Sequence, residues 1–151
     1  MSTVSFASPT RALCRVVPYL LFTLACMPVQ AALVAARAPG RRTFPKWYHA
    51  RCLRLLGLKV VTRGTPSSAR PTLYVANHVS YLDISVLGAL LPASFIAKAE
   101  VADWPLFGWL AKLQRTVFVE RNARRAADHR DEIGARLEAG DDLILFPEGT
   151  S

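Results

Sequence analysis

The first 82 of the 151 residues contain no aspartate or glutamate, and the first acidic residue is Asp83. These 82 residues carry 11 Lys and Arg, whereas residues 83–151 carry 8 basic and 11 acidic side chains, so the two parts have net charges of +11 and −3. A segment this basic indicates a polyanionic partner, either nucleic acid or an anionic membrane surface.

Cysteine is scarce as well. The three cysteines, Cys14, Cys26 and Cys52, are odd in number and lack metal-ligand spacing, so we expect no disulfide, no metal site and a reducing compartment. The sequence also contains no Gly-x-Ser-x-Gly, the motif that carries the serine nucleophile of many lipases and thioesterases.

Charge is absent from Val16 to Ala36, a run of 21 residues that is rich in leucine, valine and alanine. A helix of this length can cross a bilayer core of about 30 Å. Pro18 and Pro28 lie within the run and leave open a kinked span or a helix in the membrane interface. We therefore predict a polar N-terminus over residues 1–15 and a membrane anchor helix over residues 16–36.

A secretory signal peptide is the competing interpretation, because Val29-Gln30-Ala31 resembles a cleavage site. The flanking charges oppose it. Arg11 and Arg15 precede the apolar run, but six basic residues follow it (Arg37, Arg41, Arg42, Lys46, Arg51 and Arg54). The positive-inside rule then places the following domain on the cytoplasmic side of the cell membrane. Because the basic residues flank an apolar segment and no nucleic-acid-binding motif is recognisable, we expect membrane lipid, and no nucleic acid, as the partner.

Residues 37–57 are basic, and the pattern from Phe44 to Leu56 is that of an amphipathic helix with Trp47 and Tyr48 near its start. This pattern is typical of a helix in the headgroup region. A solvated helix packed on the domain fits nearly as well.

Residues 58–151 alternate between short apolar runs and amphipathic stretches. The pattern predicts strands at 59–63, 72–76, 94–97, 115–119 and 143–146, with helices at 84–91 and 123–138. This order is typical of an α/β fold with a mostly parallel sheet and helices on its faces. An aromatic segment at 104–111 fits either a core helix or a surface that contacts lipid or an acyl chain.

The segment from Asn77 to Asp83 lies where the strand at 72–76 ends. His78 suits a general base, and Asp83 could orient its imidazole. In a second interpretation, Ser80 and Asp83 form a helix-capping box of the type Ser-x-x-Asp. The two are compatible only if His78 precedes the helix, because five helical residues would place the two side chains about 140° apart.

Two further corners follow predicted strands: Arg121, and the segment Pro147-Glu148-Gly149-Thr150. The carboxyl ends of parallel strands lie on the same side of a sheet, where ligands bind. The three corners could therefore converge on one crevice.

These residues resemble the glycerolipid acyltransferases, which include the 1-acylglycerol-3-phosphate acyltransferases. The first family motif, Asn-His followed by four residues and Asp, matches Asn77, His78 and Asp83. The second, an apolar strand that ends in arginine, is similar to Val117–Arg121. The third, Phe-Pro-Glu-Gly-Thr, is identical to residues 146–150.

The resemblance implies transfer of a fatty acyl group from acyl-CoA or acyl carrier protein to the free hydroxyl of a lysophospholipid. Lysophosphatidic acid is the first acceptor to expect, and an ornithine-type lysolipid is an alternative. His78 would be the base and Asp83 would hold its ring. Arg121 would bind the acceptor's phosphate. Glu148 would orient Arg121 or a hydroxyl, and backbone amides of Gly149 and Thr150 would approach the phosphate, with Asn77 in the same binding set. No metal or redox cofactor is implied.

The family continues beyond its third motif, whereas this sequence stops at Ser151. We therefore expect the N-terminal part of such a domain, with an incomplete sheet that leaves an exposed edge and apolar surface. A lipid thioesterase and a lipid-binding fragment without activity remain as alternatives.

Overall fold

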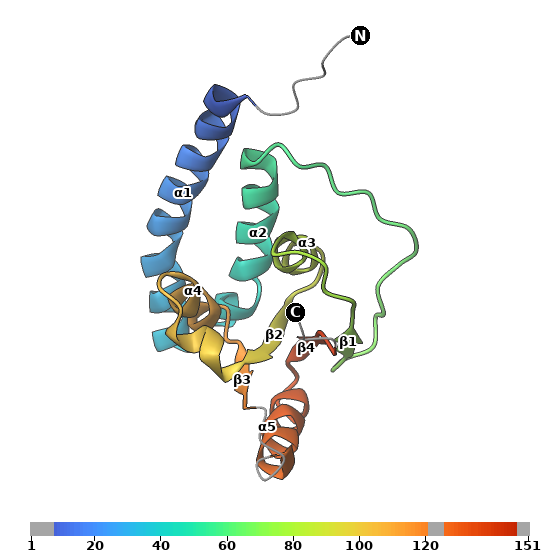
Figure 1. Cartoon of the computed structure of the whole chain (residues 1–151). Coiled ribbons are helices and arrows are strands. Elements are labelled where there is room, and N and C mark those ends of the chain that lie inside the picture. Colours follow the sequence, from blue (N-terminus) through green and yellow to red (C-terminus); the bar gives the residue numbers. More distant parts are fainter. Residues whose placement is uncertain (1–7, 121–125, 148–151) are drawn as a thin grey trace.

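The computed structural model describes residues 8–120 and 126–147, and its four strands form one parallel sheet in the order β1-β4-β2-β3 (Figure 1). The predicted mostly parallel α/β fold is confirmed. The elements are α1 (Pro9–Ala35), the 3₁₀ turn η1 (Pro39–Arg42), α2 (Phe44–Leu55), β1 (Leu73–Val75), α3 (Leu82–Leu90), β2 (Ala93–Lys98), the 3₁₀ turn η2 (Ala99–Asp103), α4 (Phe107–Leu113), β3 (Val117–Val119), α5 (Ala126–Glu138) and β4 (Asp142–Leu145).

The sheet is buried between helices on both faces, with α3 on one side and α5 on the other (Figure 1). Neighbouring residues of one strand point to opposite faces. Phe95 and Ile144 accordingly pack toward α3, against Ile84 and Leu87. Ile96, Val117 and Leu143 pack toward α5, against Ile133 and Leu137. This double burial explains why the central strands are apolar without alternation.

One edge of the sheet is open, as expected. On the edge strand β1, Leu73 and Val75 are 40% and 62% exposed. They are paired in register with Leu143 and Leu145, so they lie on the α5 face, and α5 does not cover them.

Helix α1 begins at Pro9, earlier than predicted, and continues through Pro18 and Pro28. It is long and apolar enough to cross a membrane, and most of its surface is exposed. Its buried residues are Thr23, Cys26 and Gln30, all in its second half. The Thr23 hydroxyl lies 2.9 Å from the Tyr48 hydroxyl of α2, and the Gln30 side-chain amide donates to the carbonyls of Arg41 and Leu113. The second half of α1 is therefore part of the folded domain.

Helix α2 forms over the predicted range, and it packs between α1 and α3 (Figure 1). Pro45, His49, Cys52 and Leu53 are buried. Trp47 remains 44% exposed, with the Arg51 guanidinium over its ring. The structure thus gives this helix a packed face, and its contact with headgroups stays a prediction.

The predicted strand at 59–63 is wrong: these residues form no ladder, and Val61 is 76% exposed.

In the aromatic segment at 104–111, α4 starts only at Phe107, and Phe107 and Trp109 are 55% and 65% exposed. These exposures favour the surface interpretation over the core helix.

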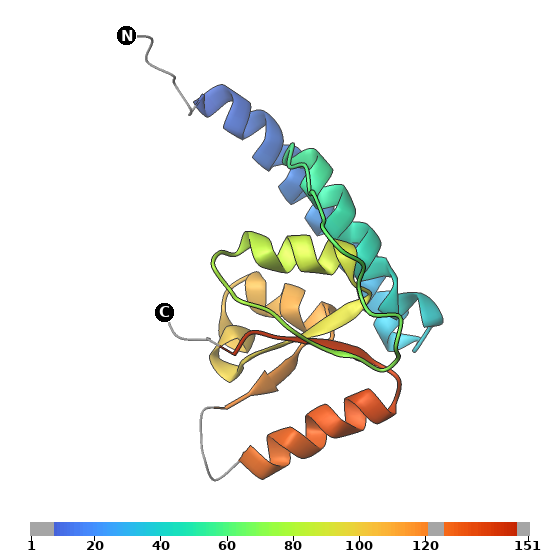
Figure 2. The ribbon, with the colours of Figure 1, turned by 90° about the vertical axis from the view of Figure 1, so that its right-hand side faces the viewer.

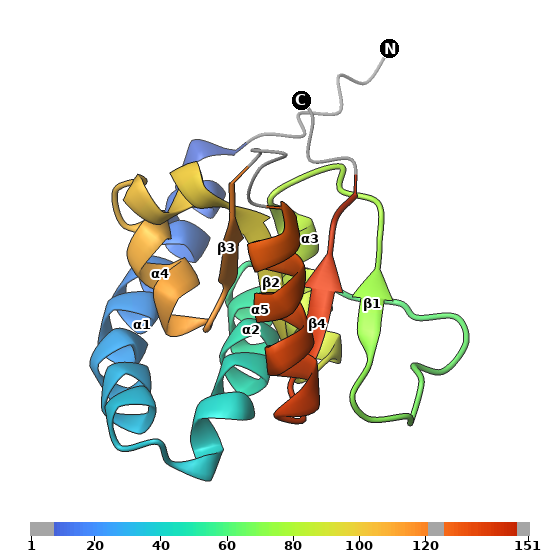
Figure 3. The ribbon, with the colours of Figure 1, turned by 90° about the horizontal axis from the view of Figure 1, so that it is seen from below.

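The strands and α1 run in opposite directions. Figures 2 and 3 both show the amino end of α1 on the side to which the carboxyl ends of the strands point. The amino half of α1 is largely exposed, although Arg15 lies against Gly57 just after α2, and this half and the candidate site face the same side of the molecule.

Candidate active site

The corner after β1 is organised by the carboxylate of Asp83. Its Oδ2 atom accepts hydrogen bonds from the backbone N–H groups of Val79 (2.7 Å) and Ser80 (2.8 Å). The Ser80 hydroxyl accepts from the backbone N–H of Leu82 at 3.1 Å. Of these three donors only the Leu82 N–H belongs to α3, and the N-cap residue Tyr81 makes no side-chain capping bond. Asp83 therefore holds the turn that precedes α3, and His78 precedes the helix, as the catalytic interpretation requires.

His78 and Asp83 are in contact. The imidazole Nδ1 lies 3.2 Å from Asp83 Oδ2, and the two side chains are 30% and 26% exposed. The backbone N–H of Ser80, followed by that of Val79 and by His78, lowers the pKa of Asp83, and partial burial only partly opposes this shift. The carboxylate thus stays charged and accepts a hydrogen bond from the Nδ1–H group. This arrangement leaves Nε2 of His78 as the nitrogen that can take a proton.

Phe146 adds an aromatic contact to the same imidazole. Its ring stacks on that of His78, with centroids 4.3 Å apart and an interplanar angle of 24°, and it also stacks on Phe95 at 6.0 Å. Strands β1 and β4 are paired, with Val75 opposite Leu145, so the residues that follow each strand lie side by side. The first and third motifs therefore meet at His78. This stacking was not predicted, because a sequence pattern does not reveal which strands are neighbours.

The other predicted site residues are described only in part. Asn77 is exposed immediately before His78. Arg121, Glu148, Gly149 and Thr150 lie outside the described residues. Strand β3 ends at Val119, at the same carboxyl-terminal end of the sheet as β1 and β4, and two strand spacings, about 10 Å, separate β3 from β4. Convergence of Arg121 and Glu148 on His78 stays a prediction.

Residues that could bind a metal are not grouped in the described parts of the chain. Within 8–120 and 126–147, no three His, Cys, Asp or Glu residues are placed to hold an ion. Cys14, Cys26 and Cys52 are free thiols, the first exposed and the other two buried.

A second histidine lies behind the site and was not predicted. His49 of α2 is 7% exposed, and its Nε2 is 3.1 Å from Gln114 Oε1, at the end of α4. Its Nδ1 has no hydrogen-bond partner. Burial lowers the pKa of His49 to about 4, and the hydrogen bond with Gln114 opposes the shift. The imidazole is therefore neutral at pH 7, and it packs against Gly88 of α3.

Residues 56–151 match the family model described as Acyltransferase, which is more than half of the chain. The chain belongs to the acyltransferase family. It is 44% identical over 134 residues to the lyso-ornithine lipid O-acyltransferase of Rhizobium meliloti (strain 1021), which covers 87% of this chain and 46% of the relative. It is 45% identical over 130 residues to the protein of that name from Brucella abortus (strain 2308), covering 85% and 49%. A 1-acyl-sn-glycerol-3-phosphate acyltransferase of Neisseria gonorrhoeae is 39% identical over 94 residues, covering 62% and 36%.

The fold is similar to that of a solved acyltransferase. The crystal structure of the 1-acyl-sn-glycerophosphate (LPA) acyltransferase PlsC from Thermotoga maritima matches with a TM-score of 0.58 and 26% identity, over 90% of this chain and 63% of that one. The chain spans about half the length of the curated relatives that it matches.

Proposed function

We propose that this acyltransferase transfers a fatty acyl group from a thioester, on coenzyme A or acyl carrier protein, to the free hydroxyl of a lysolipid. The contact between His78 and Asp83 at the carboxyl end of β1, with the third motif stacked against it, is the observation that supports this most directly. A thioester is already activated, so the reaction needs a base and needs no covalent enzyme intermediate.

The chemistry follows from the orientation of the imidazole. Nε2 of His78 would accept the proton of the acceptor hydroxyl as its oxygen attacks the thioester carbonyl. The C–S bond then breaks, and the imidazolium returns the proton to the leaving thiolate. Asp83 would stabilise the imidazolium, because its lowered pKa keeps it ionised throughout.

For the acceptor, we propose lyso-ornithine lipid first and lysophosphatidic acid second, because the relatives named for the former match with higher identity over more of the chain. Arg121 would bind the acceptor's anionic group, either a carboxylate or a phosphate. Glu148 would pair with the ammonium of an ornithine headgroup, or orient Arg121 in the phosphate case. The backbone amides of Gly149 and Thr150 would complete the anion site.

The amino half of α1 supports membrane attachment in one leaflet. The helix from Pro9 to Phe22 extends about 20 Å, less than a bilayer core of about 30 Å, and the rest of α1 packs on the domain. Arg11 and Arg15 lie in this half, so we place it at headgroup level, with Leu13, Leu20 and Leu21 toward the acyl chains. The burial of Gln30 and its two hydrogen bonds oppose cleavage after Ala31.

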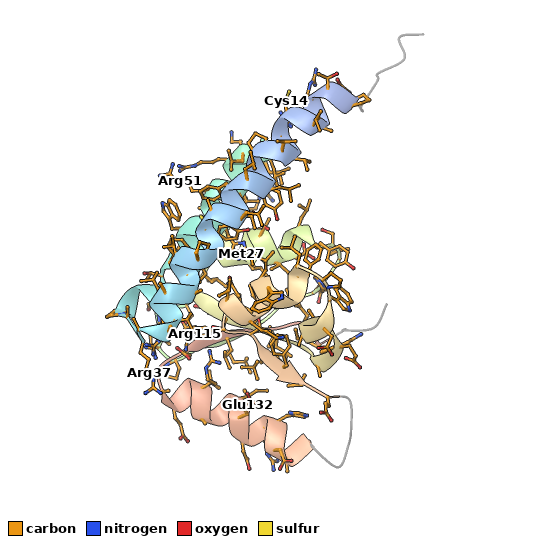
Figure 4. All side chains as sticks on the ribbon, turned by 90° about the vertical axis from the view of Figure 1, so that its left-hand side faces the viewer. Cys14, Met27, Arg37, Arg51, Arg115 and Glu132 are labelled. Carbon is orange, nitrogen blue, oxygen red and sulfur yellow. The ribbon has the colours of Figure 1, made fainter. Side chains whose placement is uncertain are left out.

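The charge distribution suggests which leaflet is involved. Figure 4 shows Cys14 near one end of α1, with Arg37 and Arg115 at the other end. Because basic side chains are attracted to anionic headgroups, which are abundant in the cytoplasmic leaflet, we propose that the domain lies on the cytoplasmic side.

The test is acyl transfer from labelled acyl-CoA, and separately from labelled acyl carrier protein, to each of the two acceptors. The His78→Gln variant should lose transfer while it still folds. Transfer at the wild-type rate by His78→Gln would remove the proposed base. Release of free fatty acid without any lysolipid would instead identify a thioesterase.

A further inference from the structure

The surface beside His78, at the carboxyl-terminal end of the strands, is unusually apolar. We propose that this apolar rim, defined as Val79, Tyr81, Leu82, Leu106 and Phe107, inserts among the lipids of the membrane leaflet in which α1 lies. The inference rests on the proposed function, since it states how a lipid acceptor would reach the site.

The rim is exposed although its side chains are large and apolar. Val79, Tyr81, Leu82, Leu106 and Phe107 are 88%, 68%, 47%, 38% and 55% exposed. They come from two elements, the corner before α3 and the start of α4. The rings of Tyr81 and Phe107 join the two, with centroids 6.4 Å apart. An apolar patch of this kind on a soluble surface indicates an interaction site.

The backbone beneath the rim is held in place. The bonds from the N–H groups of Val79 and Ser80 to Asp83 fix the first part. In the second part, Leu106 has a φ of 61°, and a Cβ on Gly108 would lie 2.2 Å from the carbonyl oxygen of Ala102. The turn before α4 is therefore too tight for any side chain at position 108. Both parts present their apolar side chains outward from a packed backbone.

Continuity with α1 favours lipid as the occupant. The amino end of α1 and the carboxyl ends of the strands lie on the same side in Figures 2 and 3. The exposed Leu13, Leu20 and Leu21 of α1 and the apolar rim can therefore enter one leaflet together. Tyrosine is favoured at the interface, where its ring is apolar and its hydroxyl remains hydrated.

Insertion of the apolar rim would set the height of the catalytic pair. His78 is next to Val79 in the chain, and Asp83 is next to Leu82. With these neighbours among the acyl chains, the imidazole lies at the level of the headgroups. A lysolipid in the leaflet would then present its hydroxyl to His78 without leaving the membrane.

The experiment measures depth with single tryptophans. The three native tryptophans are changed to phenylalanine (W47F, W104F, W109F), and one reporter is added: Phe107→Trp on the rim, Leu20→Trp on α1, or Glu132→Trp on α5. Each protein is mixed with phosphatidylcholine and phosphatidylglycerol vesicles whose acyl chains carry bromine, which quenches tryptophan. We expect the reporters at positions 107 and 20 to lose roughly half of their fluorescence or more, and the reporter at 132, on the far face, to keep it.

A matched pair of substitutions provides a second measurement. Leu82 on the rim and Leu73 on β1 are 47% and 40% exposed. Leu82→Ser should weaken vesicle partitioning about three- to tenfold, since about 1 kcal/mol of apolar burial is lost, and Leu73→Ser should leave it unchanged.

Quenching at position 20 without quenching at position 107 would overturn the proposal. It would show that a protein segment, and not lipid, covers the rim. Equal effects of the two leucine substitutions would also overturn it. No acyl transfer is measured here, so either result leaves the proposed reaction to its own test.

Discussion

The imidazole of His78 stacks on the ring of Phe146, 68 positions later in the chain, with ring centroids 4.3 Å apart. Because β1 and β4 are parallel neighbours, the residues that follow them lie side by side at one end of the sheet. His78, the candidate general base, is therefore held from two sides. Asp83 holds one nitrogen of the ring, and Phe146 holds its face.

Replacement of Asp83 tests the first of these contacts. Asp83→Asn keeps an oxygen that can accept from Val79 and Ser80, but it cannot stabilise an imidazolium. We expect kcat for acyl transfer to fall on the order of a thousandfold, with little change in KM. Ser80→Ala serves as the control, since it removes only the bond to the Leu82 N–H and should change kcat by less than about threefold. Equal losses in both variants would mean that Asp83 acts only by holding the turn before α3.

The stacking contact is tested with Phe146→Leu, which keeps an apolar side chain and removes the aromatic ring. An aromatic pair is worth about 0.5–1.5 kcal/mol beyond burial, and a freer imidazole is less well placed for proton transfer. We expect kcat to fall about tenfold while KM stays within about twofold. Phe95→Leu is the matched control, because the Phe95 ring stacks on Phe146 and not on His78. If both variants lose kcat equally, packing of the sheet explains the effect, and the contact with His78 does not.

The sequence predicted those parts of the site that local patterns encode. Apolar runs that end at Asn77 and Pro147 placed two motifs after parallel strands, and the capping pattern placed His78 before α3. The strand order β1-β4-β2-β3 is a long-range property, so the contact between His78 and Phe146 could not be predicted. The same limit explains the wrong prediction of a strand at 59–63. The side chains alternate there, but the segment pairs with no strand of the sheet. His49 and Asp141 gave no signal, because only tertiary packing buries them.

The Asp141 carboxylate pairs with several guanidinium groups at the opposite, amino-terminal end of the strands. It is 4% exposed and pairs with Arg42 (2.9 Å), Arg136 (2.6 Å) and Arg115. Removal of the charge leaves these arginines without their counterion, so Asp141→Asn should lower the free energy of unfolding by about 3–5 kcal/mol. Urea denaturation measures this, with the exposed Glu138→Gln as control. A loss below about 1 kcal/mol would contradict a structural role for this cluster.

The same carboxylate makes stability depend on acid pH. Burial acts to raise the pKa of Asp141, but hydrogen bonds and charge from Arg115 and Arg136 outweigh burial and hold it below its usual range. A lowered pKa means that the unfolded chain binds the proton more readily. The stabilisation is therefore present above the unfolded value of about 3.9 and is lost as the pH falls through the folded value. In Asp141→Asn this acid-dependent loss should be reduced, as measured by urea midpoints between pH 3 and pH 6.

His49 should add a second acid-dependent loss of stability, which begins at a higher pH than the loss caused by Asp141. Its pKa is about 4 in the folded chain because the ring is buried, against about 6.5 for a free histidine. The unfolded chain takes up the proton first, so stability is complete above about pH 6.5 and declines toward pH 4, by on the order of 3 kcal/mol. His49→Gln removes the titrating group, so its urea midpoint should vary less over this range than that of the wild type. An identical pH dependence in the two proteins would show that the imidazole is not buried in solution.

Gly88 of α3 packs against His49, and α3 also carries Asp83 in its first turn. A Cβ at position 88 would lie 2.4 Å from Cδ2 of the His49 ring. Gly88→Ala must therefore push α3 away from α2, and we expect a loss of about 1–3 kcal/mol in the free energy of unfolding. Since α3 carries Asp83 at its start, kcat should also fall.

Gly134→Ala on α5 is the matched control, as nothing lies within 4 Å of a Cβ there. The same chemical change should stabilise that helix by about 0.5–1 kcal/mol. The double variant His49→Ala with Gly88→Ala should be more stable than the sum of the single effects, because the shortened side chain gives the new methyl group room. If the effects add without interaction, the ring of His49 is not what Gly88 accommodates, and α3 is placed by other contacts.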